Sequence, residues 1–461
     1  MTPKRSTNYF RQAKSRWVTN KWKCTFTALI VLIALLVTSL FATTHVVYAA
    51  GNTYYVATNG SDNSPGTQSQ PWLTLQKAAS TVVAGDTVFI RAGIYNERLN
   101  VTNKFGTASQ RITFENYSNE NPVIDGTGLG TLGAIYIDSS SYITIDGLEV
   151  QNTAGAGVQA SYGENHYLEF LNMTVHDCGT DAFNIGYPYH FGQVTNILIS
   201  GCNLYNLCKS DGADRGLSIT SVDSFEVKNS TIADTNGHNG LDALVGSTNG
   251  KIDHNEFARS SLYIDAFGQP TSNIDVYDNY IHDAPFHAIL LGCEQHPASV
   301  TNINFYNNLF YNNHQGALVV YGEAGGFTTL TFSFVNNTCY ENAGSGWADI
   351  RFGDATSNYS SCVIANNIIV CATDNTPPII NKYHSNGTTV DHNLLFCANG
   401  TLYPEVTDVI HGTNAIIANP LLVNPPTDFS IASNSPAINA ASSTLAPTTD
   451  YAGTSRSQGA G

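Results

Sequence analysis

Residues 252–255 read Ile-Asp-His-Asn, and residues 276–279 read Val-Tyr-Asp-Asn. Each is a short, β-prone string of apolar and polar residues that ends in asparagine. Strings of this type recur along the middle of the chain, and their last residues are separated by 31, 27, 25, 24, 29, 29, 30 and 26 positions. These last residues are Asn172, Asn203, Ser230, Asn255, Asn279, Asn308, Asn337, Asn367 and Asn393.

A repeat of this length without helical periodicity predicts an all-β solenoid. Two or three short strands fit into each unit, and they must be parallel because each unit repeats the one before it. Coils of such a solenoid stack at ~4.8 Å. A β-propeller is the competing all-β repeat, but its units of ~40 residues are longer than these. We expect the recurrent asparagine to tolerate left-handed backbone at a turn and to bond to the same amide in the next coil.

Both ends of the repeat differ from its middle. Residues 73–83 place Leu75, Ala78, Ala79 and Val82 on one face of a short helix, which we expect to cap the first coil. Prolines at 420, 425 and 436 break the repeat at the other end. We therefore predict a solenoid domain over residues 50–440 and a Ser/Gly/Thr-rich C-terminal tail over residues 441–461.

The first 49 residues have the pattern of a signal peptide. A basic stretch ends at Lys23, an apolar run extends from Phe26 to about Ala42, and Val47-Tyr48-Ala49 offers small residues for cleavage. A retained membrane anchor is the alternative reading. We expect a secreted, extracellular protein. Eight cysteines follow the signal, and with no CxxC pair among them they are compatible with either disulfides or buried thiols.

Charge excludes several classes of partner. The chain has 20 basic and 36 acidic residues, and seven of the basic residues but no acid lie in the first fifty positions. The remainder, with 13 basic and 36 acidic residues, has a formal charge of −23. A surface this negative repels nucleic acid and anionic lipid, so we expect neither nucleic acid nor, after signal cleavage, a membrane as partner. We expect a monomer.

The N-terminal part of the predicted domain contains residues 54–62 (YYVATNGSD), Pro71-Trp72, Ala84-Gly85-Asp86-Thr87 and residues 91–97 (RAGIYNE). These motifs are similar to the start of family 9 polysaccharide lyases and of several β-helical glycosidases. This part of the chain therefore resembles the pectate-lyase-like superfamily of secreted right-handed parallel β-helix proteins. Residues 419–421 and 435–438 are similar to the ends of the same proteins. The resemblance implies a single right-handed parallel β-helix that acts on carbohydrate.

Acids that recur at one place in neighbouring coils are the candidate catalytic residues. Asp242 and Asp265 share the phrase apolar-Asp-Ala-apolar at a spacing of 23 residues, which predicts two outward carboxylates stacked roughly 5 Å apart. Glu294 and Glu323 each lie 15 residues after their asparagine and are expected to form a second column. A surface position for all four acids is the alternative interpretation.

Paired carboxylates suit a glycosidase, which needs one proton donor and one nucleophile or water-activating base. We expect Asp242 and Asp265 to form the central pair, with Glu294 and Glu323 beside it. No cofactor or metal is then required. A lyase would instead need a base and a cation, and Lys209, Arg215, His238 and Arg259 are candidates, with Ca²⁺ possible at the two Asp residues. The residues expected to contact a sugar are Tyr263, His287, Tyr321, Trp347 and Arg215.

The sequence therefore predicts a secreted enzyme that cleaves the glycosidic bonds of a polysaccharide on the outer face of the solenoid. Hydrolysis is favoured because an acid-lined groove repels a polyuronate. Two alternatives stay open, a calcium-dependent lyase and a noncatalytic carbohydrate-binding protein.

Overall fold

The computed structural model describes residues 51–456, apart from 211–214, 238, 295, 323–324, 345, 373–375, 385 and 398–403. The predicted signal segment and Glu323 lie outside the described residues. No helix within the described residues has both the length and the apolar character that crossing a bilayer requires.

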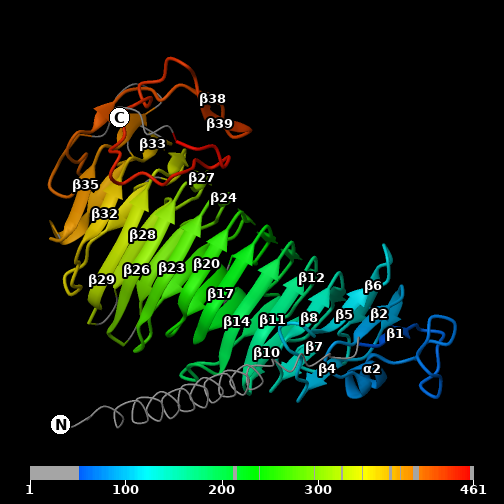
Figure 1. Ribbon diagram of the computed structural model, residues 1–461. Coiled ribbons are helices and arrows are strands. Elements are labelled where there is room, and N and C mark those ends of the chain that lie inside the picture. The colour runs from blue at the N-terminus through cyan, green and yellow to red at the C-terminus, as the bar shows by residue number, and fades with distance from the viewer. Residues whose placement is uncertain are drawn as a thin grey trace, which may run out of the picture. The chain divides into compact units, whose positions relative to one another are not determined.

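The described chain forms a parallel β-helix, in which each coil adds one strand to each of three parallel sheets (Figure 1). The chain passes from sheet 1 to sheet 2 to sheet 3 and then begins the next coil. The solenoid predicted from the asparagine repeat is confirmed.

Sheet 1 has 13 strands in the order of the chain. They are β1 (Thr53–Val56), β2 (Thr87–Ile90), β5 (Ile112–Asn116), β8 (Ile143–Asp146), β11 (Asn165–Leu171), β14 (Val194–Ser200), β17 (Val222–Lys228), β20 (Thr248–Asp253), β23 (Thr271–Tyr277), β26 (Ala298–Tyr306), β29 (Phe327–Val335), β32 (Cys362–Ala365) and β35 (Thr388–Asp391).

Sheet 2 also has 13 strands. They are β3 (Gly93–Tyr95), β6 (Pro122–Asp125), β9 (Glu149–Gln151), β12 (Thr174–His176), β15 (Asn203–Tyr205), β18 (Thr231–Ala233), β21 (Glu256–Ala258), β24 (Tyr280–His282), β27 (Leu309–Tyr311), β30 (Thr338–Tyr340), β33 (Ile368–Cys371), β36 (Leu394–Cys397) and β37 (Ile416–Ile417).

Sheet 3 has 11 strands. They are β4 (Leu99–Thr102), β7 (Ile135–Asp138), β10 (Val158–Tyr162), β13 (Phe183–Ile185), β16 (Arg215–Thr220), β19 (Asn239–Leu244), β22 (Leu262–Asp265), β25 (Ile289–Cys293), β28 (Leu318–Gly322), β31 (Ile350–Phe352) and β34 (Ile379–Asn381).

One continuous core fills the solenoid. Strand residues alternate between the interior and the outside, as in β14, where Ile197 and Ile199 are buried and Leu198 is half-buried. All eight cysteines of the described chain are buried thiols without a disulfide. Burial of this kind supplies the main stabilising free energy, roughly 25 cal/mol for each Å² of apolar surface removed from water.

The asparagine ladder runs along the turn between sheets 1 and 2. The side-chain amide of Asn279 donates to Asn308 Oδ1 (3.0 Å), and that of Asn308 donates to Asn337 Oδ1 (3.0 Å). The backbone N–H of Asn279 also donates to Asn308 Oδ1 (3.0 Å). The same contacts continue from Asn337 to Asn367 and on to Asn393. Every amide of the ladder therefore has a partner although all of them are buried.

Two details of the predicted ladder are wrong. Asn203 pairs with Thr231, so the residue that occupies the ladder position in that coil is Cys202, whose N–H donates to Ser230 Oγ (3.1 Å). Asn172 is displaced in the opposite direction: Thr174 pairs with Asn203, so Met173 aligns with Cys202 and Asn172 lies one residue before the ladder position. The left-handed backbone also belongs to the preceding residue, such as Asn307 (φ 57°), and not to the ladder asparagine itself. The ladder asparagines thus supply the hydrogen bonds between coils, and the column of residues directly before them adopts the left-handed backbone.

The predicted N-terminal helix is present as α2 (Leu75–Thr81). Thr74 accepts a hydrogen bond from the N–H of Lys77 and so caps the first turn. Leu75, Ala78 and Ala79 are buried, in agreement with the predicted apolar face. That α2 protects the first coil from other strands stays a prediction.

The C-terminal part returns to the outer face of sheet 2. After η1 (Lys382–His384) and the last coil, an antiparallel hairpin forms from β38 (Leu422–Asn424) and β39 (Asp428–Ile431). Later residues hydrogen-bond to the turns of earlier coils: Asn366 Nδ2 donates to Ser442 O (3.0 Å), and Asn307 Nδ2 donates to Thr449 O (2.9 Å). The described part of the predicted tail is thus attached to the solenoid.

Candidate active site

The candidate site lies on the outer face of sheet 3, across β13, β16, β19, β22 and β25. Leu241, Ala243, Leu262 and Ile264 point into the main core. Tyr263 belongs instead to a small separate apolar cluster with Val245, Phe267 and Leu290. Asp242 and Asp265 alternate with the core residues of their strands and so belong to the outer face of sheet 3, but both are buried there, at 1% and 3% exposed, and not open to solvent.

The predicted stacking of the two aspartates is wrong. Asp242 pairs with Tyr263, and Asp265 pairs with Gly292 of the next coil. Asp265 is therefore displaced by two residues along the strand. With ~3.3 Å per residue and ~4.8 Å between coils, the Cα atoms of the two aspartates are separated by roughly 8 Å, not 5 Å.

Asp242 is held by Arg215. The Nε atom of Arg215 donates to Asp242 Oδ2 (2.8 Å), while Asp242 Oδ1 is buried and has no hydrogen-bond partner among the described residues. Asp242 is only 1% exposed, whereas the side chain of Arg215 is 41% exposed. Burial raises the pKa of Asp242 well above its ordinary range, although Arg215 acts in the opposite direction. Asp242 therefore stays protonated well above the pH at which an exposed aspartate ionises.

Asp265, Tyr263 and Glu294 form the second half of the site. The hydroxyl of Tyr263 donates to Glu294 Oε1 (2.6 Å), and the N–H of Glu294 donates to Asp265 Oδ1 (3.3 Å). Burial, followed by the charge of Glu294, raises the pKa of Asp265 to about 6. Gly292 makes room for the Tyr263 ring, because a Cβ there would lie 2.6 Å from Tyr263 Cε2.

Asp181 and Ser218 belong to the same site and were not predicted. Ser218 pairs with Asp242, and its hydroxyl donates to Asp181 Oδ1 (2.5 Å). Burial raises the pKa of Asp181, and Arg215 counteracts it. The phrase Asp-Ala-apolar occurs at Asp181 just as it does at Asp242 and Asp265, so a search for every copy of the phrase would have found it.

The predicted sugar-contacting residues are spread over several coils: Tyr321 lies in β28, whereas His287 and Trp347 lie in the segments before β25 and β31. Tyr321 pairs with Gly292, so it lies two coils beyond Asp265 in the same row, and it is 51% exposed. Arg351 stacks over the Trp347 ring, with its Cζ atom 5.1 Å from the ring centroid. Burial lowers the pKa of His287 to about 4, and its Nε2 is buried with no hydrogen-bond partner in the part of the chain that the structure describes. His287 is therefore neutral at neutral pH.

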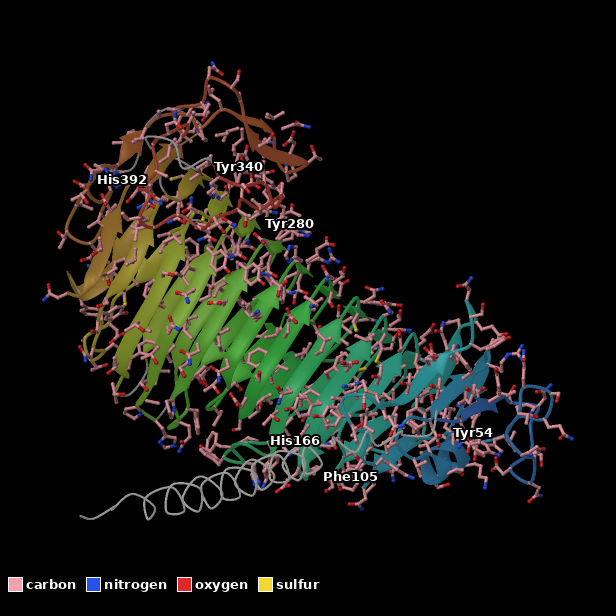
Figure 2. All side chains as sticks on the ribbon, viewed as in Figure 1. Tyr54, Phe105, His166, Tyr280, Tyr340 and His392 are labelled. Carbon is pink, nitrogen blue, oxygen red and sulfur yellow. The ribbon has the colours of Figure 1, made fainter. Side chains whose placement is uncertain are left out.

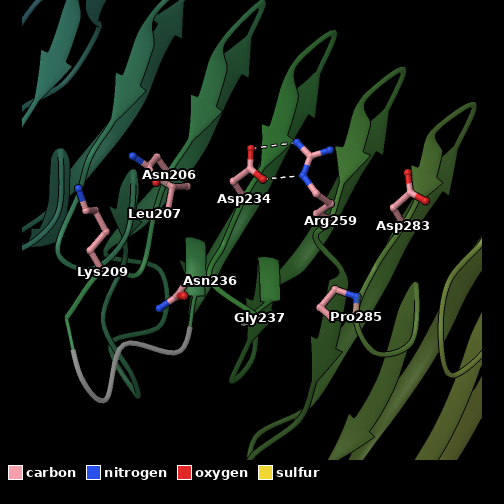
Figure 3. Close-up of a pocket in the computed structure, with 9 residues that line it drawn as sticks. All are labelled: Asn206, Leu207, Lys209, Asp234, Asn236, Gly237, Arg259, Asp283 and Pro285. Atoms are coloured by element: carbon pink, nitrogen blue, oxygen red, sulfur yellow. Dashed lines mark hydrogen bonds and ion pairs between the residues drawn. The ribbon is translucent and has the colours of Figure 1, made fainter.

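A groove runs along the edge where the chain enters sheet 3 (Figure 3). Its volume is about 660 Å³, and its walls come from segments that directly precede β16, β19, β22 and β25. It contains Lys209, which bonds to Asp177 (2.7 Å), and Arg259, which forms an ion pair with Asp234. The groove crosses several coils, so an extended ligand could lie along it.

The site contains acids but no clear metal-ligand set. Within the described residues, no group of three or more His, Cys, Asp or Glu side chains is arranged to hold a metal ion. His238, a predicted candidate base, lies outside the described residues, as does Glu323.

Comparison with known proteins identifies the type of fold. Residues 54–250, fewer than half of the chain, match the model of the Pel9A-like right-handed β-helix region. Over these residues the chain resembles pectate-lyase-like right-handed parallel β-helix proteins. The matched region includes Asp181, Arg215 and Asp242, but ends before Asp265.

Two relatives align with short stretches of this chain. Protein YwoF of Bacillus subtilis (strain 168) is 39% identical over 116 residues, which is 24% of this chain and 25% of the relative. Pectate lyase PEL9 of Emericella nidulans is 29% identical over 139 residues, which is 27% of this chain and 34% of the relative. The aligned stretches thus span only a quarter to a third of these relatives.

Solved structures agree on the fold. The complex of XylC with xylose superposes with a TM-score of 0.55 at 12% identity and covers 80% of this chain and 87% of that chain. The GH136 lacto-N-biosidase from Eubacterium ramulus superposes with a TM-score of 0.53 at 15% identity, over 75% and 68% of the two chains. At these identities the likeness shows the fold alone.

Proposed function

We propose that this protein is a secreted carbohydrate-active enzyme that cleaves glycosidic bonds of a polysaccharide on the outer face of sheet 3. The observation that carries the proposal is the group of three buried carboxyl groups, Asp181, Asp242 and Asp265, whose pKa values are all raised. Raised pKa values in a group of acids are characteristic of acid–base sites. The Pel9A-like match supports the carbohydrate-active class.

Hydrolysis assigns one role to each central aspartate. Asp242 is protonated, and its unpartnered Oδ1 carries the proton that is donated to the leaving glycosidic oxygen. Asp265 ionises at about pH 6 and activates the attacking water. Their offset places the Cα atoms roughly 8 Å apart, which is compatible with the ~6.5 to 9.5 Å between carboxyl groups of inverting glycosidases. No metal or cofactor is required for these steps.

Neighbouring side chains position Asp242 and Asp265. Arg215 orients the Asp242 carboxyl group, and because it is partly exposed while Asp242 is buried, it must move for a sugar to reach Asp242. Tyr263 and Glu294 hold the region around Asp265. Tyr321 and Trp347 lie in later coils, where their rings stack on further sugar units. We propose that the enzyme acts as a monomer, without nucleic acid or membrane partners.

The test is a reducing-end assay of the mature protein against a panel of neutral and acidic polysaccharides. We expect Asp242→Asn and Asp265→Asn each to lower turnover by ~10³-fold or more, because each removes a proton-transfer role. Asp275→Asn, on the outer face of sheet 1, is the matched control and should retain full activity. Binding of a polysaccharide without any new ends would favour the noncatalytic alternative.

A second candidate is β-elimination of a uronate polymer. It is favoured by the similarity to a pectate lyase and by the cations Lys209, Arg215 and Arg259 along the groove and the site. Lys209 and Arg259 are bonded to aspartates, which reduces their ability to attract an acidic chain. Activity that requires added calcium and is confined to polyuronates would favour this second candidate.

A further inference from the structure

A second cleft lies on a different face of the molecule from the candidate active site. It is enclosed between the outer face of sheet 2 and the C-terminal segment, and its volume is about 660 Å³. The sheet side contributes Tyr280, Leu309, Thr338 and Ile368, which occupy one column of successive strands. This size falls within the ~300 to 1,000 Å³ that is typical of ligand sites.

Three aromatic residues, Tyr280, Phe429 and Tyr451, line this cleft. Phe429 of β39 lies between two tyrosines of sheet 2, with its ring centroid 6.1 Å from that of Tyr280 and 6.0 Å from that of Tyr340. Both tyrosines lie beside the C-terminal segment in Figure 2. Tyr451, from the C-terminal segment, also lines the cleft and is 40% exposed. The rings of Phe429 and Tyr451, both from the C-terminal segment, can each pack on the apolar face of a sugar unit.

The walls are fixed by hydrogen bonds to the coils. Arg456 Nη2 donates to Asn307 Oδ1 (2.9 Å), and Asn307 Nδ2 donates to Thr449 O (2.9 Å). The N–H of Ser442 donates to Asn366 Oδ1 (2.8 Å). The turns of two separate coils thus hold the C-terminal segment over the sheet, so the cleft exists before any ligand binds. Because these segments are already ordered, the protein loses less conformational entropy when a ligand binds in the cleft.

The charges of the lining indicate which glycans fit. The lining includes the acids Asp428 and Asp450 and a single described cation, Arg456. The guanidinium of Arg456 is engaged by Asn307 and Thr449. An anionic sugar would therefore meet a net negative lining, whereas a neutral sugar would meet aromatic rings and amide groups.

We propose that the cleft between sheet 2 and the C-terminal segment is a second carbohydrate-binding site, which holds a neutral glycan chain. It would keep the protein attached to a polysaccharide while the face of sheet 3 acts on it. Binding here does not depend on the proposed catalysis, so either proposal can fail alone.

The experiment is affinity electrophoresis of the mature protein in gels that contain arabinoxylan, galactomannan, mixed-linkage β-glucan or polygalacturonate. The Asp265→Asn variant is used so that no gel is degraded. We expect retardation by at least one neutral polysaccharide, and Phe429→Ala and Tyr451→Ala should each weaken the apparent affinity by about tenfold, the loss of one stacked ring.

Phe105→Ala is the matched control, because Phe105 is 59% exposed and lies on an early coil, remote in sequence from the cleft. This variant should bind the polysaccharide as tightly as the parent does. Tyr451→Ala removes a partly exposed ring, so it keeps the test valid if Phe429→Ala unfolds in a thermal melt. Retardation by polygalacturonate alone, retardation by none of the four, or affinity unchanged in both cleft variants would overturn the proposal.

Discussion

At the scale of single residues, the two central aspartates differ in their surroundings and therefore in their protonation. Asp242 is completely enclosed and bonded to Arg215, while Asp265 accepts a hydrogen bond from the N–H of Glu294. Burial raises the pKa of both groups, and that of Asp265 reaches about 6. The proposed acid–base roles require that Asp242 keep its proton after Asp265 has lost its own.

This difference predicts a bell-shaped dependence of activity on pH. We expect kcat/KM to rise with pH through about 6, as Asp265 loses its proton, and to fall at higher pH as Asp242 ionises. Initial rates on the best polysaccharide, measured from pH 4 to pH 9 in buffers of constant ionic strength, check this. A rate that falls steadily from pH 4 upward would contradict the assignment of Asp265 as the base.

The same pKa shift predicts that the site destabilises the fold at neutral pH. An unfolded aspartate ionises near 3.8, so the folded state binds the proton of Asp265 more tightly. Stability from this group is present below pH 3.8 and is lost as pH rises through about 6. At pH 7.5 the free energy of unfolding of Asp265→Asn should therefore exceed that of the parent by an amount on the order of 3 kcal/mol, and the variant should melt at a higher temperature.

Thermal melts of both proteins at several pH values from 4 to 7.5 provide the measurement. The advantage of Asp265→Asn should grow as pH rises. An advantage that is constant over this range would show that ionisation of Asp265 is not its cause.

At the scale of elements, the turn between sheets 1 and 2 depends on buried amides. Asn308 accepts from Asn279 and donates to Asn337 Oδ1 (3.0 Å) and Val276 O (2.9 Å). Asn308→Leu removes these partners and leaves buried polar groups unsatisfied. We expect a loss of roughly 2 to 4 kcal/mol in the free energy of unfolding, since each orphaned group costs ~1 to 3 kcal/mol.

The control for this prediction is Asn304→Ala, on the outer face of β26, where the amide donates to Asp275 Oδ1 (2.9 Å) with solvent nearby. Denaturant titrations of both variants should show a loss of no more than ~1 kcal/mol for the control. Equal losses would mean that the ladder has no special energetic role.

The register of the strands explains why the sequence located the site only in part. Leu241 and Leu262 pair across adjacent coils and are 21 residues apart, whereas Asp242 and Asp265 are 23 residues apart. The shared phrase therefore does not mark the same position in the two coils. The number of residues in the turns varies from coil to coil. The asparagine repeat at the turn between sheets 1 and 2 therefore does not fix the register of residues in sheet 3.

At the scale of the whole molecule, the sequence predicted the solenoid because its periodic signal is physical. A buried amide ladder requires one asparagine per coil, and inward apolar residues require alternation in every strand. Contacts between distant segments have no such signal. The bond between Asn307 and Thr449, and with it the cleft over sheet 2, could not be read from any local pattern.

The central claim is that the carboxyl groups on sheet 3 hydrolyse a glycosidic bond. The most direct measurement is mass spectrometry of products formed in water labelled with heavy oxygen, with and without a chelator. Hydrolysis predicts one labelled oxygen in each new reducing end and no effect of the chelator. Unlabelled products with an unsaturated, ultraviolet-absorbing end, formed only without the chelator, would contradict the claim and establish elimination in its place.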